Sequence, residues 1–314
     1  MRIVVALGGN ALSIRGETLT GDSQRASIRV AAKALAQLLE AGHEVVITHG
    51  NGPQVGYLAL QGAAFPLDVL GAETDGMIGY VLQQELDNAY RPEAKYATLL
   101  TQIEVDPDDP AFQTPTKFIG AIYTEEEATA LGAERGWTIG QDGPHFRRTV
   151  PSPRPKRILE IDVIRILLDQ GVVIICAGGG GIPVVQKDDG TMIGVEAVID
   201  KDHASGLLAR DLEADAFLML TDVKGVFTGW GTPEQALITH ATPDQMAAFS
   251  FPNGSMGPKV DAACEFARAT GGFAAIGNLA DTMQLIDGTT GTRVSLAEDA
   301  ETGASDQSAA YQRA

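Results

Sequence analysis

Apolar and polar positions along the chain follow two patterns: short apolar runs, and longer segments in which apolar residues recur with helical spacing. The apolar runs end at glycine or polar residues, as buried strands do, and we expect strands at 2–7, 44–48, 97–105, 172–176, 216–220, 274–276 and 292–295. Helical spacing predicts helices across 28–39, 77–86 and 159–168, and a hairpin is expected within 184–198. Because strands and helices alternate, the pattern predicts an α/β fold with a doubly wound parallel sheet.

Several of the expected strands run directly into glycine-rich turns. Gly8 and Gly9 follow the first strand, and Gly50 and Gly52 follow the second. Glycine lets backbone amides approach a ligand, and open α/β sheets bind ligands at the carboxyl ends of their strands. A simple tight turn explains the first of these turns equally well, and the GxGxxG spacing of a dinucleotide site is absent. Four consecutive glycines at 178–181 are costly in backbone entropy, so a phosphate-binding loop explains them better than a plain turn.

Two lysines stand at the expected N-termini of helices. Asp200 is a plausible N-cap, which places Lys201 in the first turn of a helix and Asp202 beside it. Pro258 suits a first helical position and puts Lys259 in the same setting. A cation opposes the positive end of the helix dipole, so one bound polyphosphate would account for both lysines. Taken alone, the first stretch is better explained as an ordinary capped surface helix.

Proline- and glycine-rich segments at 106–115 and 151–155 bound a stretch of different composition. The enclosed residues 116–157 contain aromatic residues and short alternating runs, and they predict an inserted lobe rather than a linker. Lys117 on this lobe could close over a site, although a solvated surface lysine is the simpler interpretation.

Composition narrows the class of function. The 314 residues carry a formal charge of −18, which argues against nucleic acid or an acidic membrane as a partner.

Cys176 and Cys264 form no disulfide framework and no metal-binding spacing, so buried free thiols are expected. No signal peptide is evident and no apolar run approaches the roughly 20 residues that span a bilayer, so a cytoplasmic protein is expected. Residues 297–314 are polar and acidic and predict a disordered tail.

Collected in order, these segments resemble the carbamate kinases of the amino-acid kinase family from the first strand to about Ser295. The segments that carry the resemblance are 8–12 (GGNAL), 49–56 (HGNGPQVG), 115–117 (PTK), 147–153 (RRTVPSP), 178–184, 200–202 (DKD), 220–223 (LTDV) and 254–256 (GSM). Each segment is weak alone, but the order is specific, and the inserted lobe separates carbamate kinases from relatives such as acetylglutamate kinase.

The resemblance implies an open three-layer αβα sandwich with a mainly parallel central sheet and a protruding lobe. It implies one kinase domain over 1–296 whose N-terminal half binds carbamate and whose C-terminal half binds the nucleotide. It further implies a homodimer that transfers phosphoryl between ADP/ATP and carbamate/carbamoyl phosphate, usually to make ATP in arginine catabolism. Mg²⁺ would be held chiefly by the nucleotide phosphates, and no protein metal ligand is expected.

The same resemblance assigns roles to individual residues. The catalytic group is Lys117, Lys201, Asp202 and Lys259, in which three lysines stabilise phosphate charge and Asp202 organises two of them. The substrate-binding residues are Gly8, Gly9, Asn10, Gly50, Asn51 and Gly52. The nucleotide-binding residues are Gly178, Gly179, Gly180, Gly181, Thr221, Asp222, Val223 and Met256.

The sequence departs from the family pattern at Phe118, His203, Lys224 and Gly257, and none of these positions carries a proposed catalytic group. Two alternatives stay open at this point. One is a kinase for another small carboxylate such as acetylglutamate, and the other is a non-catalytic nucleotide-binding sensor on the same fold.

Overall fold

An eight-stranded sheet forms the centre of the molecule. The computed structural model describes residues 1–12, 20–60, 65–90, 94–252 and 254–296, and the predicted tail at 297–314 lies outside them. The strand order is β15-β17-β16-β12-β1-β2-β9-β3. These strands are β15 (His240–Ala241), β17 (Thr292–Val294), β16 (Phe273–Asn278), β12 (Ala216–Thr221), β1 (Arg2–Leu7), β2 (Glu44–His49), β9 (Val172–Ile175) and β3 (Lys95–Thr98). All neighbours pair in parallel except β16 and β17, so the sheet is mainly parallel, as predicted.

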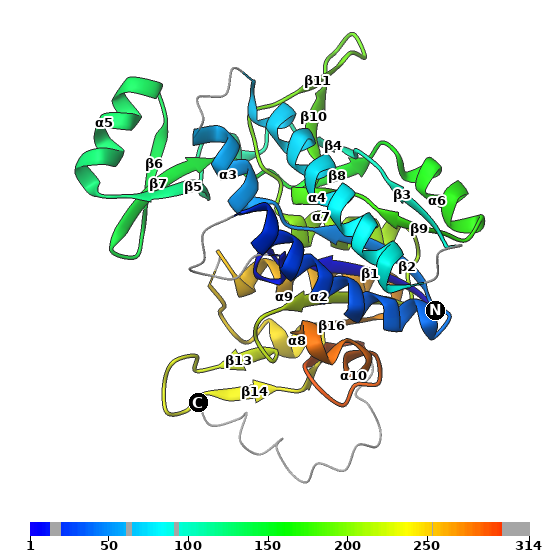
Figure 1. Cartoon of the computed structure of the whole chain (residues 1–314). Helices are drawn as coiled ribbons and strands as arrows, with labels where there is room; N and C mark the ends of the chain where they lie inside the picture. The colour runs from blue at the N-terminus through cyan, green and yellow to red at the C-terminus, as the bar shows by residue number, and fades with distance from the viewer. Residues whose placement is uncertain (13–19, 61–64, 91–93, 253, 297–314) are drawn as a thin grey trace.

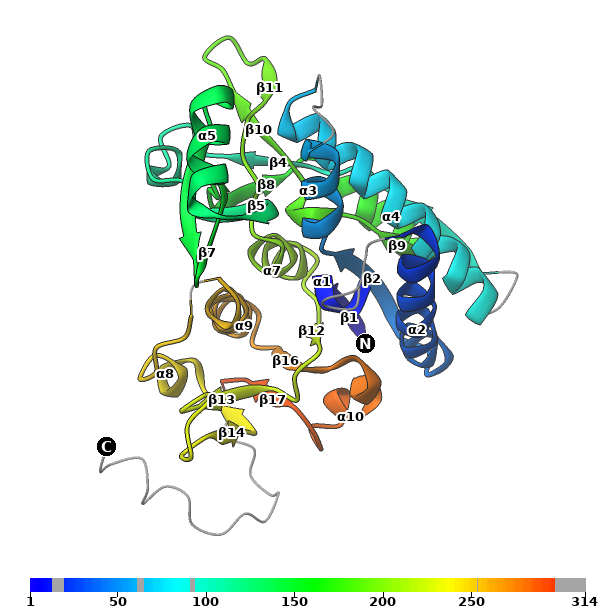
Figure 2. The ribbon, with the colours of Figure 1, turned by 60° about the vertical axis from the view of Figure 1, so that its left-hand side comes forward.

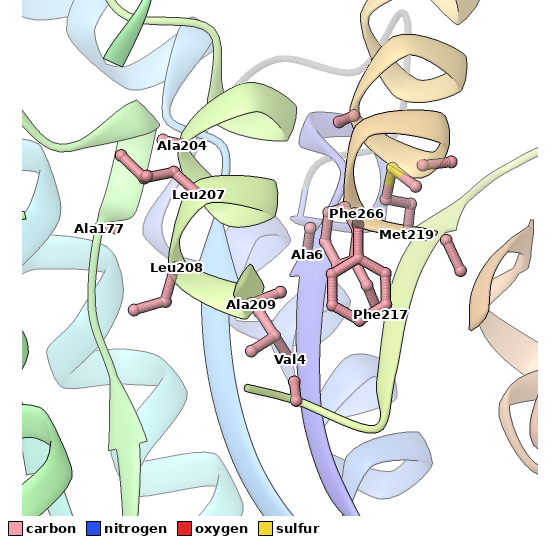
Figure 3. Packing of buried hydrophobic residues seen from close by; sticks show 14 of the residues in the cluster. Val4, Ala6, Ala177, Ala204, Leu207, Leu208, Ala209, Phe217, Met219 and Phe266 are labelled. Carbon is pink, nitrogen blue, oxygen red and sulfur yellow. The ribbon is translucent and has the colours of Figure 1, made fainter. Parts of the chain in front are cut away.

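Strand β1 shows why the sheet is covered on both faces. Its side chains alternate: Val4 and Ala6 belong to one buried core, and Ile3, Val5 and Leu7 to the other. A parallel strand buried on both faces needs an almost continuous apolar sequence, which β1 has. Figure 3 shows the first core, in which Val4 and Ala6 lie among residues from the neighbouring strand and helices.

Helices form the two outer layers. One face is covered by α7 (Lys201–Asp211), α9 (Met256–Thr270), α6 (Ile161–Asp169) and α8 (Pro243–Met246). The opposite face is covered by α2 (Gly21–Glu40), α4 (Leu67–Ala89) and α10 (Thr282–Ile286). Figures 1 and 2 show the resulting three layers, with α7 and α9 packed side by side. The predicted open αβα sandwich is therefore confirmed.

Short helical segments lie at the ends of the strands. They are α1 (Gly9–Leu12), α3 (Gly52–Leu60), η1 (Pro110–Phe112), η2 (Gly178–Gly180) and η3 (Leu279–Asp281). A small hairpin of β13 (Val226–Thr228) and β14 (Ala236–Ile238) follows β12. No helix in the described part of the chain is both long and apolar enough to cross a membrane.

A second sheet of four strands shows that one strand prediction was wrong. Its order is β11-β10-β4-β8, comprising β11 (Met192–Gly194), β10 (Ile182–Gln186), β4 (Gln102–Val105) and β8 (Pro155–Ile158). The single strand expected at 97–105 is divided between β3 in the central sheet and β4 in this one. The chain leaves the central sheet between Leu99 and Thr101. The amide of Leu99 donates to the carbonyl of Ile175 in β9, whereas the carbonyl of Thr101 accepts from the amide of Ile182 in β10. The predicted hairpin at 184–198 is present as the antiparallel pair β10–β11.

A third sheet builds the protruding lobe. It consists of β5 (Lys117–Tyr123), β7 (His145–Val150) and β6 (Thr138–Asp142), with α5 (Glu125–Arg135) on it. Figure 1 shows this unit standing out from the body. The lobe, as the term is used below, is Lys117–Val150. The longer predicted stretch 116–157 also takes in part of β8, which pairs with β4 in the body.

Candidate active site

The glycine turns and the N-terminus of α7 meet at the carboxyl ends of the central strands. The amide of Gly8 donates to Leu220 at 2.8 Å, and the amide of Gly50 donates to Leu7 at 3.0 Å. A Cβ atom on Gly50 would lie 3.2 Å from the backbone nitrogen of Gly9 and 3.5 Å from Cδ of Lys201. The structure therefore brings the turns after β1 and β2 together with one of the predicted lysines.

Asp202 joins two of the predicted lysines. Its Oδ1 lies 2.5 Å from Nζ of Lys201, and its Oδ2 lies 2.7 Å from Nζ of Lys259. The Asp202 side chain is 5% exposed. Because both carboxylate oxygens accept from ammonium groups, Asp202 holds the first turns of α7 and α9 together.

Burial and mutual charge set the protonation of this group. Burial lowers the pKa of Lys201 to about 8, with the nearby charge of Lys259 acting in the same direction and the charge of Asp202 partly compensating. Burial also opposes the charge on Lys259, but Asp202 outweighs it and raises the pKa of that lysine. Burial favours neutral Asp202, yet the two ammonium groups hold the pKa of its carboxyl below the usual range. Of these two lysines, Lys201 is therefore the one that loses its proton first.

The lobe delivers the third lysine to the same place. Nζ of Lys117 lies 2.5 Å from Oδ2 of Asp200, while Oδ1 of Asp200 accepts from the amide of Asp202 at 2.9 Å. Asp200 is thus the N-cap of α7, as predicted. Although burial raises the pKa of its carboxyl, the charges of Lys117 and Lys201 outweigh that effect and hold the pKa well below its usual range. The contact between Asp200 and Lys117 was not predicted, because the two residues lie far apart in sequence.

A buried polar cluster supports the turn after β2. Nε2 of His49 lies 3.3 Å from Oδ1 of Asp75 on α4, and both side chains are almost fully buried. Asn51 donates to the hydroxyl of Thr74 at 2.9 Å, and Thr74 is also on α4. Neither Asp75 nor Thr74 was predicted. The placement of apolar residues on α4 predicts its core face, but gives no sign of polar partners buried on the same helix.

The four-glycine turn packs against this cluster. A Cβ atom on Gly178 would lie 1.8 Å from Asp75 and 2.4 Å from His49, and one on Gly179 would lie 2.1 Å from Asn51. At Gly180 it would meet the carbonyl of Ile199, and at Gly181 the side chain of Ile103. Close contact with other parts of the protein therefore requires these glycines. Their predicted contact with nucleotide stays a prediction.

The remaining predicted nucleotide residues lie on the other side of β1, at β12 and α9. Thr221 ends β12, and its hydroxyl donates to Asp222 at 3.1 Å, with Val223 next in the chain. Met256 begins α9, so this helix starts two residues before Pro258, the first helical position that we predicted. Gly257 is explained by crowding, because a Cβ atom there would lie 3.0 Å from the carbonyl oxygen of Pro252. Asn10 and Gly52 lie in α1 and α3, and the side chain of Asn10 is outside the described part of the structure.

Among the described residues, no group of three or more histidine, cysteine, aspartate and glutamate side chains is arranged to hold a metal ion. Cys176 and Cys264 are buried and unpaired, as predicted.

Comparison with known proteins identifies the family. The sequence model of the amino acid kinase family matches residues 1–278. The chain belongs to the amino acid kinase family. Its relatives in this family include carbamate kinase of Rhizobium meliloti, which is 55% identical over 94% of this chain and 93% of its own length. Carbamate kinase of Haemophilus influenzae is 54% identical over 94% of this chain and 96% of its own length.

A solved structure of the family has the same architecture. Carbamate kinase of Giardia lamblia bound to AMP-PNP superposes with a TM-score of 0.86 and 40% identity, over 93% of this chain and 98% of that one. The family prediction made from the motifs is therefore confirmed, and so is the fold class.

Proposed function

We propose that the chain is a carbamate kinase that transfers a phosphoryl group reversibly between ATP and carbamate, giving ADP and carbamoyl phosphate. The observation that carries the proposal is the meeting of Lys117, Lys201 and Lys259 at two aspartates beside the glycine turns. Phosphoryl transfer depends on positioning and on neutralising the charge that spreads over the transferring group, and preorganised cations supply both.

The site offers separate places for the two substrates. The turns that carry Gly8, Gly9 and Gly50 present backbone amides next to Lys201, and they suit the small carboxylate or phosphate group. Four residues suit the nucleotide: Thr221 ends β12, Asp222 and Val223 follow it, and Met256 begins α9, the helix that carries Lys259. Packing of Gly178–Gly180 against His49, Asn51 and Ile199 supports a role in shaping the Gly50 turn.

Each charged residue then has a defined task. Lys201 and Lys259, held by Asp202, stabilise the phosphoryl group on the side of the body, and Lys117 does so from the lobe. Mg²⁺ would be bound mainly by the nucleotide phosphates, because the carboxylates of Asp200 and Asp202 already accept from lysines. Bound there, the ion would neutralise part of the phosphate charge.

In the cell we propose that the enzyme makes ATP from carbamoyl phosphate during arginine catabolism, in the cytoplasm and as a homodimer. The two unpaired buried cysteines agree with a reducing compartment. The outer strand β3 leaves one edge of the described sheet open to a second copy. Light scattering on the purified chain would give the mass of the assembly, and a monomer at micromolar concentration would refute the dimer.

The activity is tested with purified chain, Mg²⁺, ADP and carbamoyl phosphate, with ATP measured directly. We expect ATP formation that depends on carbamoyl phosphate, and no phosphorylated product from ATP with glutamate or acetylglutamate. Folded protein without turnover in either direction would refute the kinase. Phosphorylation of acetylglutamate in preference to carbamate would assign a different substrate.

A further inference from the structure

Asp200 uses its two carboxylate oxygens for different parts of the chain. Oδ1 caps α7 by accepting from the amide of Asp202 at 2.9 Å, and Oδ2 contacts Nζ of Lys117 at 2.5 Å. A helix cap needs only a neutral acceptor, and asparagine serves as well as aspartate in that position. The cap therefore does not require the negative charge of Asp200, although the positive end of the helix dipole favours it. The charge is required for the ion pair with Lys117.

The lobe rests on the segment that leads into α7. We call residues 196–200 the docking segment. Arg148 of β7 contacts Glu196 at 3.0 Å, and the amide of Val198 donates to the carbonyl of Pro151 at 2.9 Å, just after β7. Glu196 is itself fixed by the amide of Leu67 at 2.9 Å. The Lys117–Asp200 contact is a further link to this segment, and the chain continues from it directly into Lys201.

Lys117 is also the most accessible of the three lysines. Its side chain is 33% exposed, compared with 14% for Lys201 and 12% for Lys259. The two inner lysines share Asp202, whereas Lys117 pairs with Asp200. A long, partly exposed lysine has many rotamers, so a fixed carboxylate beside it selects the one that points into the site.

We propose that Asp200 is a positioning residue whose carboxylate docks the lobe lysine, Lys117, at the site of phosphoryl transfer. This inference rests on the proposed kinase function. Asp200 acts through Lys117, and its charge keeps the lobe and the N-terminus of α7 in one arrangement before substrate arrives. During transfer Lys117 can turn from Asp200 to the phosphoryl oxygens without a large movement of the lobe.

The test uses Asp200→Asn, which keeps an acceptor for the cap and removes the charge. Asp106→Asn is the matched control: Asp106 also accepts from the amide two residues on, Asp108 at 3.0 Å, and from a lysine, Lys156 at 3.3 Å, but outside the site. We expect Asp200→Asn to lower kcat by about 10-fold or more, as misplacement of a catalytic group does. The Kd for ADP should stay within about twofold, and Asp106→Asn should match the wild type in both.

Two further measurements separate positioning from a general structural effect. In a Lys117→Ala background, Asp200→Asn should change kcat by less than about threefold, because the effects of two substitutions in residues that act as a unit do not add.

Reductive methylation of substrate-free protein, followed by mass spectrometry, should modify Lys117 several-fold faster in Asp200→Asn than in the wild type. The exposed Lys33 should react equally in both. Equal losses of kcat in the two backgrounds, or an unchanged methylation rate of Lys117, would overturn the proposal. Since methylation needs no turnover, a changed rate in a protein that makes no ATP would refute the proposed function and leave the docking contact standing.

Discussion

Asp202 has the least exposed side chain among the three lysines and two aspartates of the site. It is the shared partner of Lys201 and Lys259, and its side chain is 5% exposed. Loss of one lysine leaves the carboxylate with a cation, but loss of Asp202 leaves two buried ammonium groups facing one another. Breaking a buried pair in this way costs about 3–5 kcal/mol. Activity lost in an Asp202 variant therefore has to be compared with its stability before it is assigned to catalysis.

The protonation of Lys201 predicts the pH dependence of turnover. Burial lowers its pKa from 10.5 to about 8, with Lys259 acting in the same direction and Asp202 and Asp200 opposing. A lysine is charged below its pKa, so the cation is present at pH 7 and is lost as the pH rises through 8. We expect kcat/KM for ATP formation to fall above pH 8, because this parameter reports groups of the free enzyme.

Lys201→Arg is the control for this prediction. Arginine stays protonated throughout the range, so the variant should lose the decline above pH 8 even if its maximal rate is lower. Measurements of kcat/KM between pH 6.5 and 9.5, with product quantified after acid quench, provide the comparison. A decline that persists unchanged in Lys201→Arg would assign it to another group.

Single residues were predictable where local sequence determines their setting. Asp200 as a cap, and Lys201 and Lys259 near helix N-termini, follow from spacing and neighbouring residues. The pairing of Asp200 with Lys117 joins β5 to α7 across 83 positions, and no periodicity signals it. The same holds for His49 with Asp75: a histidine after a strand gives no indication of a carboxylate on a later helix.

At the scale of elements, the joint between α3 and β5 sets the position of the lobe. A Cβ atom on Gly56 would lie 2.7 Å from Cα and 2.8 Å from the backbone nitrogen of Gly120. Backbone cannot move aside as a flexible side chain does, so Gly56→Ala must push β5 away from α3. Lys117 begins β5, and we expect kcat to fall by about 10- to 100-fold because small misplacements of a catalytic group have that effect.

Gly71→Ala is the matched control, because Gly71 is also helical and a Cβ atom there has no neighbour within 4 Å. It should keep the wild-type kcat and gain up to about 1 kcal/mol in stability from the removal of a helical glycine. Titration with ADP should give similar affinities for both variants, since the predicted nucleotide residues Thr221 and Met256 belong to β12 and α9 and not to this joint. Wild-type turnover in Gly56→Ala would show that the joint does not position Lys117.

Elements with a strong apolar pattern were predicted well. Errors arose where pairing with a strand far away in the sequence determines which sheet a strand joins. The buried strands β1, β2, β9 and β12 lie within a residue of their expected bounds, because each is a continuous apolar run. The apolar run at 97–105 reads as one strand, but its halves pair with β9 and with β10 in different sheets. The separate sheet of the lobe depends likewise on pairing between β5, β6 and β7, which the boundary prolines and glycines do not reveal.

At the scale of the whole molecule, the chain has a formal charge of −18, whereas the candidate site is built from cations. Most ion pairs at the surface involve exposed side chains, and such pairs contribute little to stability. The array of Lys117, Lys201 and Lys259 is instead held by buried or half-buried carboxylates. Salt should therefore screen the repulsion over the surface more than it weakens the site.

This argument predicts that modest salt stabilises the fold. The Debye length shrinks from about 30 Å at 0.01 M to about 8 Å at 0.15 M, so long-range repulsion among the 41 acidic residues is screened over that range. We expect Tm to rise between these two NaCl concentrations, at fixed protein concentration and pH 7.

Glu40→Lys and Glu125→Lys make the same change in net charge at opposite ends of helices. Glu40 is the last residue of α2, and Glu125 is the first residue of α5. Both should reduce the salt dependence of Tm equally, whereas only Glu40→Lys should raise Tm at low salt, because a cation suits the C-terminal end of a helix dipole. A Tm that falls with salt in the wild type, or a salt dependence that changes in only one variant, would show that local ion pairs outweigh the net charge.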